Sequence, residues 1–284
     1  MSQKARELSM KLLFLLCACV SVAAVAVICL FIFANGLPAI VEIGVFDFLS
    51  GMRWEPSQEI FGILPMIVGS IYVTAGAVIV GVPIGVLTAV FLVKYCPARL
   101  YNLIKPAVEL LAGIPSIVYG FFGLVVVVPV VQSLSGTSGK GIFTASLLLG
   151  IMILPTIINT TEAALRAVPE SYYEGSLALG ATKERSIFRA MFPAASSGVL
   201  AGVILGVGRA IGETMAVVMI AGNQTVLPGS IFSGVRTLTA NIVLEMGYAA
   251  GLHRGALIGT AAVLFVFILI INLCFSALKR RGDK

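Results

Sequence analysis

The chain of 284 residues has a mean hydropathy of +1.06, with 59% hydrophobic and only 11% charged residues. Soluble domains carry about 25% charged residues, so this composition excludes a soluble globular protein and indicates an integral membrane protein. The net charge of +6 does not indicate a nucleic-acid-binding protein, because the basic residues are scattered between hydrophobic segments.

Six apolar stretches are long enough to cross a bilayer as helices, which predicts an all-α polytopic fold with a single transmembrane domain over residues 1–284. They lie at residues 12–34, 63–93, 107–131, 142–161, 197–221 and 255–278. The first is too long for the 7–15-residue core of a cleaved signal peptide, which is the alternative for this segment. The second contains Pro65 and Pro83, which predict a tilted helix, a kink or a short re-entrant turn.

Basic residues are concentrated on alternate connections. The N-terminus, the second loop, the fourth loop and the C-terminal tail hold 14 lysines and arginines, and the other three loops hold four. Because the more basic side of a membrane protein faces the cytoplasm, we expect both termini to be cytoplasmic.

The outer connections contain the only tryptophan and the only histidine. We interpret Trp54 as an interfacial anchor, which is a common role for tryptophan at the membrane surface. His253 has no cysteine or acidic partner at ligand spacing, and the five cysteines are an odd number in mostly apolar runs. The chain therefore predicts neither a metal site nor a disulfide framework. A short helix is expected at residues 238–246.

The fifth stretch, residues 197–221, is apolar except for Arg209 and Glu213. An arginine at mid-membrane depth costs roughly 2.5–3.5 kcal/mol, so it is rarely without a role. In one continuous helix the spacing of four places both charges on one face. The pair is then either an ion pair that locks helices together or a polar station on a solute pathway. Glycine recurs every four residues and predicts a face for close helix packing: Gly198, Gly202 and Gly206.

The largest inner connection, residues 166–192, is amphipathic. Pro169 is typical of a helix start and Gly180 of a helix end, and Pro193 begins the next span. We expect a short helix, a glycine turn and a second helix under the membrane. Such a loop can rest on lipid headgroups or dock into a groove of a soluble partner.

This connection resembles the EAA loop of ABC importer permeases, which has the pattern E-A-A-x3-G-x9-I-x-L-P. Glu174, Gly180 and Pro193 stand at the same spacing, while Gly175 and Ser176 replace the two alanines. Other segments are similar to the PstC-type permeases of bacterial phosphate importers: residues 54–56 (WEP), 61–67 (FGILPMI), 109–123 (ELLAGIPSIVYGFFG) and 209–216 (RAIGETMA). The sister PstA-type permeases share the EAA loop and the arginine-containing span, but the first two segments favour the PstC type.

The resemblance implies the fold of a type I ABC importer permease in the bacterial cytoplasmic (inner) membrane. It implies a transport subunit with four kinds of partner: a second, PstA-like permease, two ATP-binding cassette subunits, a periplasmic phosphate-binding protein and the membrane lipid. The solute would be inorganic phosphate. Residues 174–180 would form the helix that couples ATP hydrolysis by the partner to transport, so this chain would be no enzyme and would hold no cofactor.

The residues themselves also argue against an ATPase site. A phosphate-binding P-loop reads G-x4-G-K-[S/T], and residues 134–141 resemble it only superficially. Leu134 occupies the first glycine position, and Gly141 replaces the hydroxyl residue that would reach Mg²⁺. With a single histidine on an outer loop, no nucleophilic triad is expected either.

The side chains of the spans suggest how an anion would pass. A guanidinium suits phosphate oxygens, so Arg209 is the candidate binding group, and Glu213 would compete for it and return it to a paired state. Ser116 and Thr214 are further hydrogen-bonding candidates, for which helix contact is the alternative. Two other functions stay open: a permease for another oxyanion such as sulfate or molybdate, and an ion-coupled secondary carrier.

Overall fold

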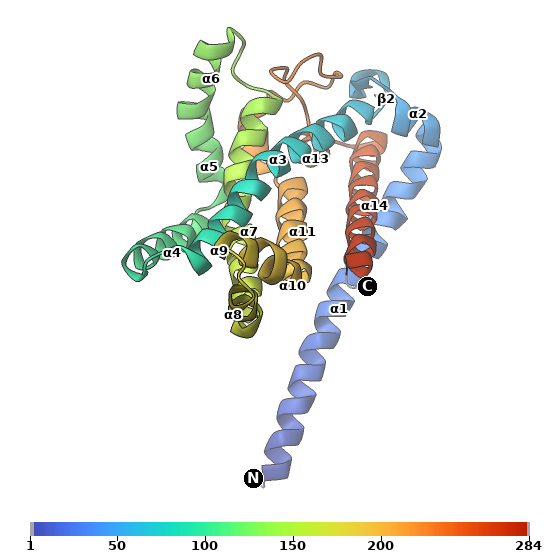
Figure 1. The fold of residues 1–284 in the computed structure, drawn as a ribbon. Coiled ribbons are helices and arrows are strands. Elements are labelled where there is room, and N and C mark those ends of the chain that lie inside the picture. The colour runs from blue at the N-terminus through green and yellow to red at the C-terminus, as the bar shows by residue number, and fades with distance from the viewer. Residues whose placement is uncertain (1–2, 283–284) are drawn as a thin grey trace.

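The computed structural model describes residues 3–282. Residues 1–2 and 283–284 lie outside the described residues, and the prediction of cytoplasmic termini includes them. The regular structure of the described chain is helical apart from one small hairpin, and a long non-helical segment joins α12 to α13 (Figure 1). The first part consists of α1 (Gln3–Ile43), α2 (Val45–Ser50), β1 (Trp54–Glu55), η1 (Pro56–Gln58), β2 (Ile60–Phe61), α3 (Leu64–Lys94) and α4 (Ala98–Gly113). The middle part consists of α5 (Ser116–Phe122), the π-helical turn η2 (Gly123–Val127), α6 (Val128–Ser135), α7 (Ile142–Ala167), α8 (Glu170–Ala178) and α9 (Lys183–Ser186). The last part consists of the π-helical turn η3 (Ile187–Met191), α10 (Phe192–Ala194), α11 (Ser196–Gly212), α12 (Met215–Ile220), α13 (Leu238–Glu245) and α14 (Gly251–Gly282).

The structure confirms the all-α class and gives five or six membrane-length helices, where the sequence predicts six. Within the described residues, five helices are long and apolar enough to cross a membrane: Glu7–Ile43, Leu64–Lys94, Ser116–Ser135, Ile142–Ala167 and Gly251–Cys274. The sixth is a bent pair, Lys183–Ala194 and Ser196–Gly212, with an angle of 74° at the bend. The second span is one uninterrupted helix with Pro83 inside it, so no re-entrant turn forms. With 31 residues α3 is about 47 Å long, and it runs obliquely because a bilayer core is only about 30 Å thick (Figure 1).

The sequence predicts the third span at residues 107–131, and its predicted start is wrong. Residues 98–113 form the separate helix α4, and the membrane-length helix begins only at Ser116 and continues to Ser135. The break falls at Ile114 and Pro115, which both have extended backbone angles. Proline lacks the N–H that would continue the helix and disfavours a helical conformation of the residue before it.

The core is built around α7, which packs against α3 on one side and α11 on the other. Glycines allow these close approaches. A Cβ atom added at Gly76 would lie 2.3 Å from the Ser146 hydroxyl, and one at Gly198 would lie 2.4 Å from Cβ of Ala164. Gly202 and Gly206 face Thr160 and Ile157 in the same way, which confirms the predicted glycine packing face of the fifth span.

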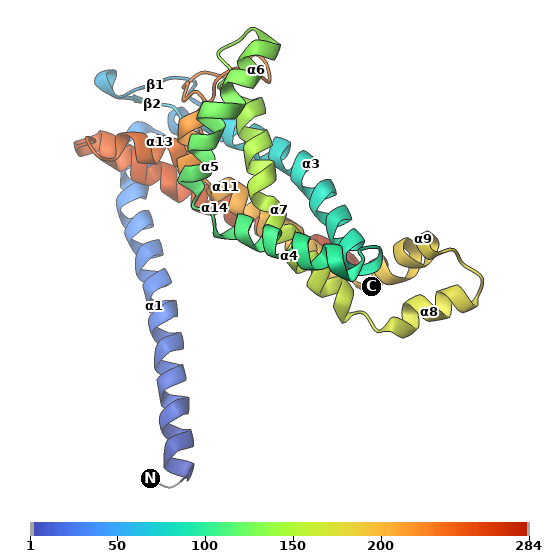
Figure 2. The same ribbon diagram turned by 90° about the vertical axis from the view of Figure 1, so that its left-hand side faces the viewer.

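The first helix stands apart from this core. Only the C-terminal part of α1 packs against α14, where Gly36 approaches the backbone of Gly259. The N-terminal part projects away from the rest of the chain (Figures 1 and 2). Its apolar side chains, such as Leu16 and Leu30, are more than half exposed, so this surface is suited to hydrocarbon rather than water.

The connections divide between two ends of the molecule. The β1–β2 hairpin, the end of α6 and the segment between α12 and α13 lie at one end, and α8 and α9 lie toward the other (Figures 1 and 2). The N-terminal end of α1 and the C-terminal end of α14 lie toward the end that carries α8. The basic loop at residues 166–192 therefore lies toward the same end of the molecule as the start of α1 and the end of α14 (Figures 1 and 2).

Candidate functional site

A break in the fifth span lies at the two charged residues that the sequence singles out. Helix α11 ends at Gly212, Glu213 has extended backbone angles, and α12 begins at Met215. The prediction of one continuous helix over 197–221 is therefore wrong, and with it the expected shared face for Arg209 and Glu213. Among residues 3–282 no ion pair joins these two side chains.

Local hydrogen bonds explain the break. The Glu213 carboxylate accepts from the backbone N–H groups of Thr214 and Ala216, at 3.1 and 3.3 Å, and so caps the start of α12. The Thr214 hydroxyl donates to the carbonyl of Gly212, at 3.1 Å. The sequence contained a signal for this helix break, because glycine, here Gly212, is typical of helix ends and threonine, here Thr214, is typical of helix starts.

Each charge therefore complements a helix end rather than the other charge. Arg209 lies in the last turn of α11, where the helix dipole is negative, and Glu213 stands before the positive end of α12. Arg209 is half-buried and makes no hydrogen bond or ion pair to any other described side chain or backbone group. A guanidinium in this state can accept an anion without first losing a partner.

A second break lies beside the first. The hydroxyl of Tyr119 on α5 donates to the carbonyl of Leu111 on α4, at 2.9 Å, and so spans the Ile114–Pro115 break. A Cβ at Gly120 would lie 2.8 Å from Cα of Ala216, and one at Gly123 would lie 3.1 Å from Ile220. Helices α5 and α12 therefore run parallel and in close contact.

This alignment places Ser116, one turn before Gly120, at the level of the Glu213–Thr214 break. Non-helical backbone at membrane depth is tolerated only where it is buried in protein or lines a water-filled cavity. The structure thus brings Ser116, Glu213 and Thr214 to one level, one turn from Arg209. The backbone at the break is itself hydrogen-bonded, since the Thr239 hydroxyl donates to the Glu213 carbonyl at 3.1 Å, so the group that this arrangement offers to an anion is the guanidinium of Arg209.

The inner connection has the predicted shape. Helix α8 follows Pro169, Gly180 adopts a left-handed conformation with φ of 84°, and α9 begins after Thr182. Glu174 and Gly175 are exposed, and Ser176 accepts a hydrogen bond of 3.0 Å from the Ser186 hydroxyl, which holds α8 against α9. Pro193 lies exposed in α10 at the bend into α11. Large apolar side chains remain exposed on this loop, above all Leu179 with 91% of its surface accessible.

An outer cluster around Glu245 was not predicted. Its carboxylate accepts hydrogen bonds from Nε1 of Trp54 at 2.8 Å and from Arg236 at 2.5 Å, and Nε2 of His253 lies 2.8 Å away. Burial alone would raise the pKa of Glu245, but the bonds from Trp54, Arg236 and His253 outweigh it and lower that pKa. Trp54 is thus a buried hydrogen-bond donor rather than an interfacial anchor, and His253 does have an acidic partner. Because Trp54 and Glu245 are 191 residues apart, no spacing rule relates them.

Comparison with known families gives a consistent result. Residues 81–284 match the family described as "Binding-protein-dependent transport system inner membrane component". The chain is 37% identical to the probable ABC transporter permease protein YqgH of Bacillus subtilis, over 93% of this chain and 89% of the relative. It is 35% identical to the phosphate transport system permease protein PstC of Mesorhizobium japonicum (84% and 80% covered) and 36% identical to PstC of Haemophilus influenzae (79% and 78% covered). The resemblance to PstC-type permeases is confirmed.

Solved structures show the same fold. The chain superposes on a chain of the MetNI methionine ABC transporter in an inward-facing conformation with a TM-score of 0.62 and 20% identity, over 82% of this chain and 100% of the other. It superposes on a chain of a bacterial alginate ABC transporter, crystallised with an alginate-bound periplasmic protein, with a TM-score of 0.65 and 14% identity, over 99% and 96%. At these identities the likeness concerns the fold alone, and it confirms the expected type I importer fold.

Proposed function

We propose that this chain, which belongs to the family of binding-protein-dependent transport system inner membrane components, is a permease subunit of an ATP-driven importer of inorganic phosphate. The relatives that carry the name PstC support phosphate over sulfate or molybdate as the solute. Membership of this family also favours an ATP-driven importer over an ion-coupled carrier.

The observation that carries the proposal is the half-buried guanidinium of Arg209, which has no partner among residues 3–282 and lies beside two helix breaks. An unneutralised arginine inside a membrane protein is costly, and phosphate is an anion whose oxygens fit the planar guanidinium in a bidentate manner. In this proposal Arg209 binds phosphate, while the hydroxyls of Ser116 and Thr214 offer additional hydrogen bonds at the same level. Glu213 stabilises the helix break, because its carboxylate accepts hydrogen bonds from the backbone N–H groups at the start of α12 and is therefore not paired with Arg209.

The inner loop would receive the ATPase. In this proposal α8, with Glu174, Gly175 and Ser176 on it and Gly180 after it, docks its exposed apolar side chains into a groove of an ATP-binding cassette subunit. Pro193 stands at the bend through which movement of the loop reaches α11. ATP would be bound and hydrolysed by two such partner subunits, so this chain would itself be neither an enzyme nor the holder of a cofactor.

The assembly would be completed in the bacterial cytoplasmic (inner) membrane. A second, PstA-like permease would supply the other half of the pathway, and a periplasmic phosphate-binding protein would deliver the solute to the end that carries the β1–β2 hairpin. The charge pattern supports an orientation in which α8 and both termini would face the cytoplasm. Residues 1–284 would act as one transmembrane permease domain surrounded by lipid.

Uptake measurements test this function. We would reconstitute the complete transporter in liposomes and measure uptake of radioactive phosphate with the Arg209→Gln variant. Uptake is expected to fall at least about tenfold, because one charge-assisted interaction with the anion contributes roughly 1.5–3 kcal/mol. The matched control is Arg254→Gln, an exposed arginine at the start of α14. Normal phosphate uptake by an assembled Arg209→Gln complex, or equal uptake of sulfate by the wild type, would refute the proposal.

A further inference from the structure

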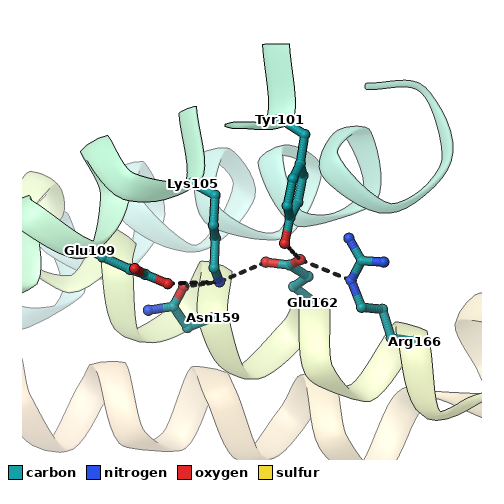
Figure 3. A network of polar contacts seen from close by, with 6 residues as sticks. All are labelled: Tyr101, Lys105, Glu109, Asn159, Glu162 and Arg166. Atoms are coloured by element: carbon teal, nitrogen blue, oxygen red, sulfur yellow. Dashed lines mark hydrogen bonds and ion pairs between the residues drawn. The ribbon is translucent and has the colours of Figure 1, made fainter. Parts of the chain in front are cut away.

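A buried carboxylate joins α4 to the inner end of α7 (Figure 3). Only 4% of the Glu162 side chain is exposed. Its two oxygens accept hydrogen bonds from the Tyr101 hydroxyl at 2.8 Å, from Nζ of Lys105 at 2.9 Å and from Nε of Arg166 at 2.9 Å. Nζ of Lys105 also donates to Oδ1 of Asn159, at 2.8 Å. A buried carboxylate is stable only when it is paired and hydrogen-bonded in this way.

This cluster lies directly before the inner loop. Arg166 is in the last turn of α7, and only Val168 and Pro169 separate that helix from α8. The start of α8 is also tied to the end of α3, because Nζ of Lys94 lies 2.7 Å from the carboxylate of Glu170. A displacement of α8 therefore reaches both the end of α3 and, through the two-residue link, the last turns of α7 that carry Glu162.

The other partner of the cluster leads to the candidate pathway. Helix α4 has 16 residues, a length of about 24 Å, and it ends at Gly113 just before the break that precedes Ser116. Apart from the Glu162 cluster, α4 is held by apolar contacts, in which Val108 packs with Leu92 and Ile158, and Leu111 packs against the main core. The Tyr119 hydroxyl also donates to the Leu111 carbonyl. The opposite face of α4 is exposed, with 73% of Leu110 accessible. Among the described residues, the bonds from Tyr101 and Lys105 to Glu162, together with the bond from Lys105 to Asn159, are the side-chain hydrogen bonds that attach the N-terminal half of α4 to α7.

We propose that Glu162 is a positioning residue that transmits movement of α8 to the break before Ser116, because its carboxylate fastens α4 to the last turns of α7. Helices act as rigid elements, and a hydrogen-bonded cluster at one end carries a displacement to the other. The inference rests on the proposed function, in which α8 receives the ATPase. The coupling of ATP hydrolysis to phosphate movement then depends on Glu162, which lies outside both the inner loop and the pathway.

The test compares transport with ATP consumption in the same liposomes. We would measure phosphate taken up and ATP hydrolysed by the complete transporter carrying Glu162→Gln, which keeps the shape of the side chain and removes its charge. ATP hydrolysis is expected to continue, while the phosphate moved per ATP falls about tenfold, within the range of coupling effects of such networks. Glu42→Gln, an exposed carboxylate on α1, is the control and is expected to leave the ratio unchanged.

The outcomes separate the alternatives. A residue with a merely structural role would lower transport and ATP hydrolysis together, so an unchanged ratio in Glu162→Gln overturns the inference. If that variant does not assemble, Tyr101→Phe decides, because it removes a single hydrogen bond: a lowered ratio supports the inference and a normal ratio overturns it. A wild-type transporter that hydrolyses ATP but moves no phosphate would instead overturn the proposed function, and the inference with it.

Discussion

Replacing Glu245 by glutamine is expected to loosen the outer hairpin that carries Trp54. The carboxylate is the common acceptor for groups from three separate segments: Trp54 in β1, Arg236 in the segment before α13, and His253 in α14. Glutamine has nearly the same shape but no charge, so the change removes the ion pair without opening a cavity.

The structure sets the size of the effect. Removing one partner of a buried ion pair costs about 3–5 kcal/mol, because the other charge stays buried. Arg236 is 15% exposed and keeps its bonds to the Asn223 carbonyl and to Oδ1 of Asn241, which favours the lower end of that range. We therefore expect a loss of about 3 kcal/mol in the free energy that holds the hairpin closed, which corresponds to roughly a hundredfold change in its opening equilibrium.

Trp54 provides the assay, because it is the only tryptophan and is just 5% exposed. Acrylamide should quench its fluorescence weakly in the wild type and several times more strongly in Glu245→Gln. Glu55→Gln is the control, since this carboxylate is adjacent to Trp54 but makes no side-chain bond to another described residue. Equal quenching in the wild type and Glu245→Gln would refute the reasoning.

The same signal has a predictable pH dependence. The pKa of Glu245 is lower in the folded protein than in the unfolded chain, so its stabilising contribution is complete above the ordinary glutamate pKa of about 4.3. The contribution is lost only as the pH falls through the lowered value. Quenching of wild-type Trp54 should thus stay constant from neutral pH down to the ordinary glutamate range and rise below it, and an increase that begins near neutral pH would contradict this assignment.

Two further changes test the helix packing and the docking loop. Gly202→Leu should destabilise the protein by about 1–3 kcal/mol or prevent its assembly, because even a Cβ would lie 3.1 Å from Thr160. The control Gly208→Leu faces open space and should leave the melting temperature unchanged. Equal melting temperatures of the two variants would contradict the packing. Leu179→Asp should weaken co-purification of the ATPase subunit at least about tenfold without lowering the melting temperature, because a charge replaces an exposed apolar contact. Leu134→Asp, at another highly exposed leucine near the end of α6, is the control. Retention of the ATPase by Leu179→Asp would argue against docking through α8.

Long-range contacts decided most of what the residue pattern missed. In both clusters a buried carboxylate accepts hydrogen bonds from residues far away in the chain: Trp54 bonds to Glu245, and Tyr101 and Lys105 bond to Glu162. Taken alone, Trp54 and His253 have the appearance of isolated surface residues. Their roles depend on how α13 and α14 pack, and no local spacing records that packing.

The sequence by itself determined that this is a membrane protein with six spans, a basic inner loop of two helices and a glycine face on α11. These properties follow from hydropathy, from charge and from the backbone preferences of glycine and proline, which act locally. Only the tertiary structure decided that α4 is separate from the third span, that Arg209 and Glu213 are divided by a break, and that Ser116 lies level with it. A helix break at membrane depth is stable only if neighbouring helices cover it and satisfy its backbone, so its position depends on contacts such as Gly120 with Ala216 rather than on the residues at the break alone.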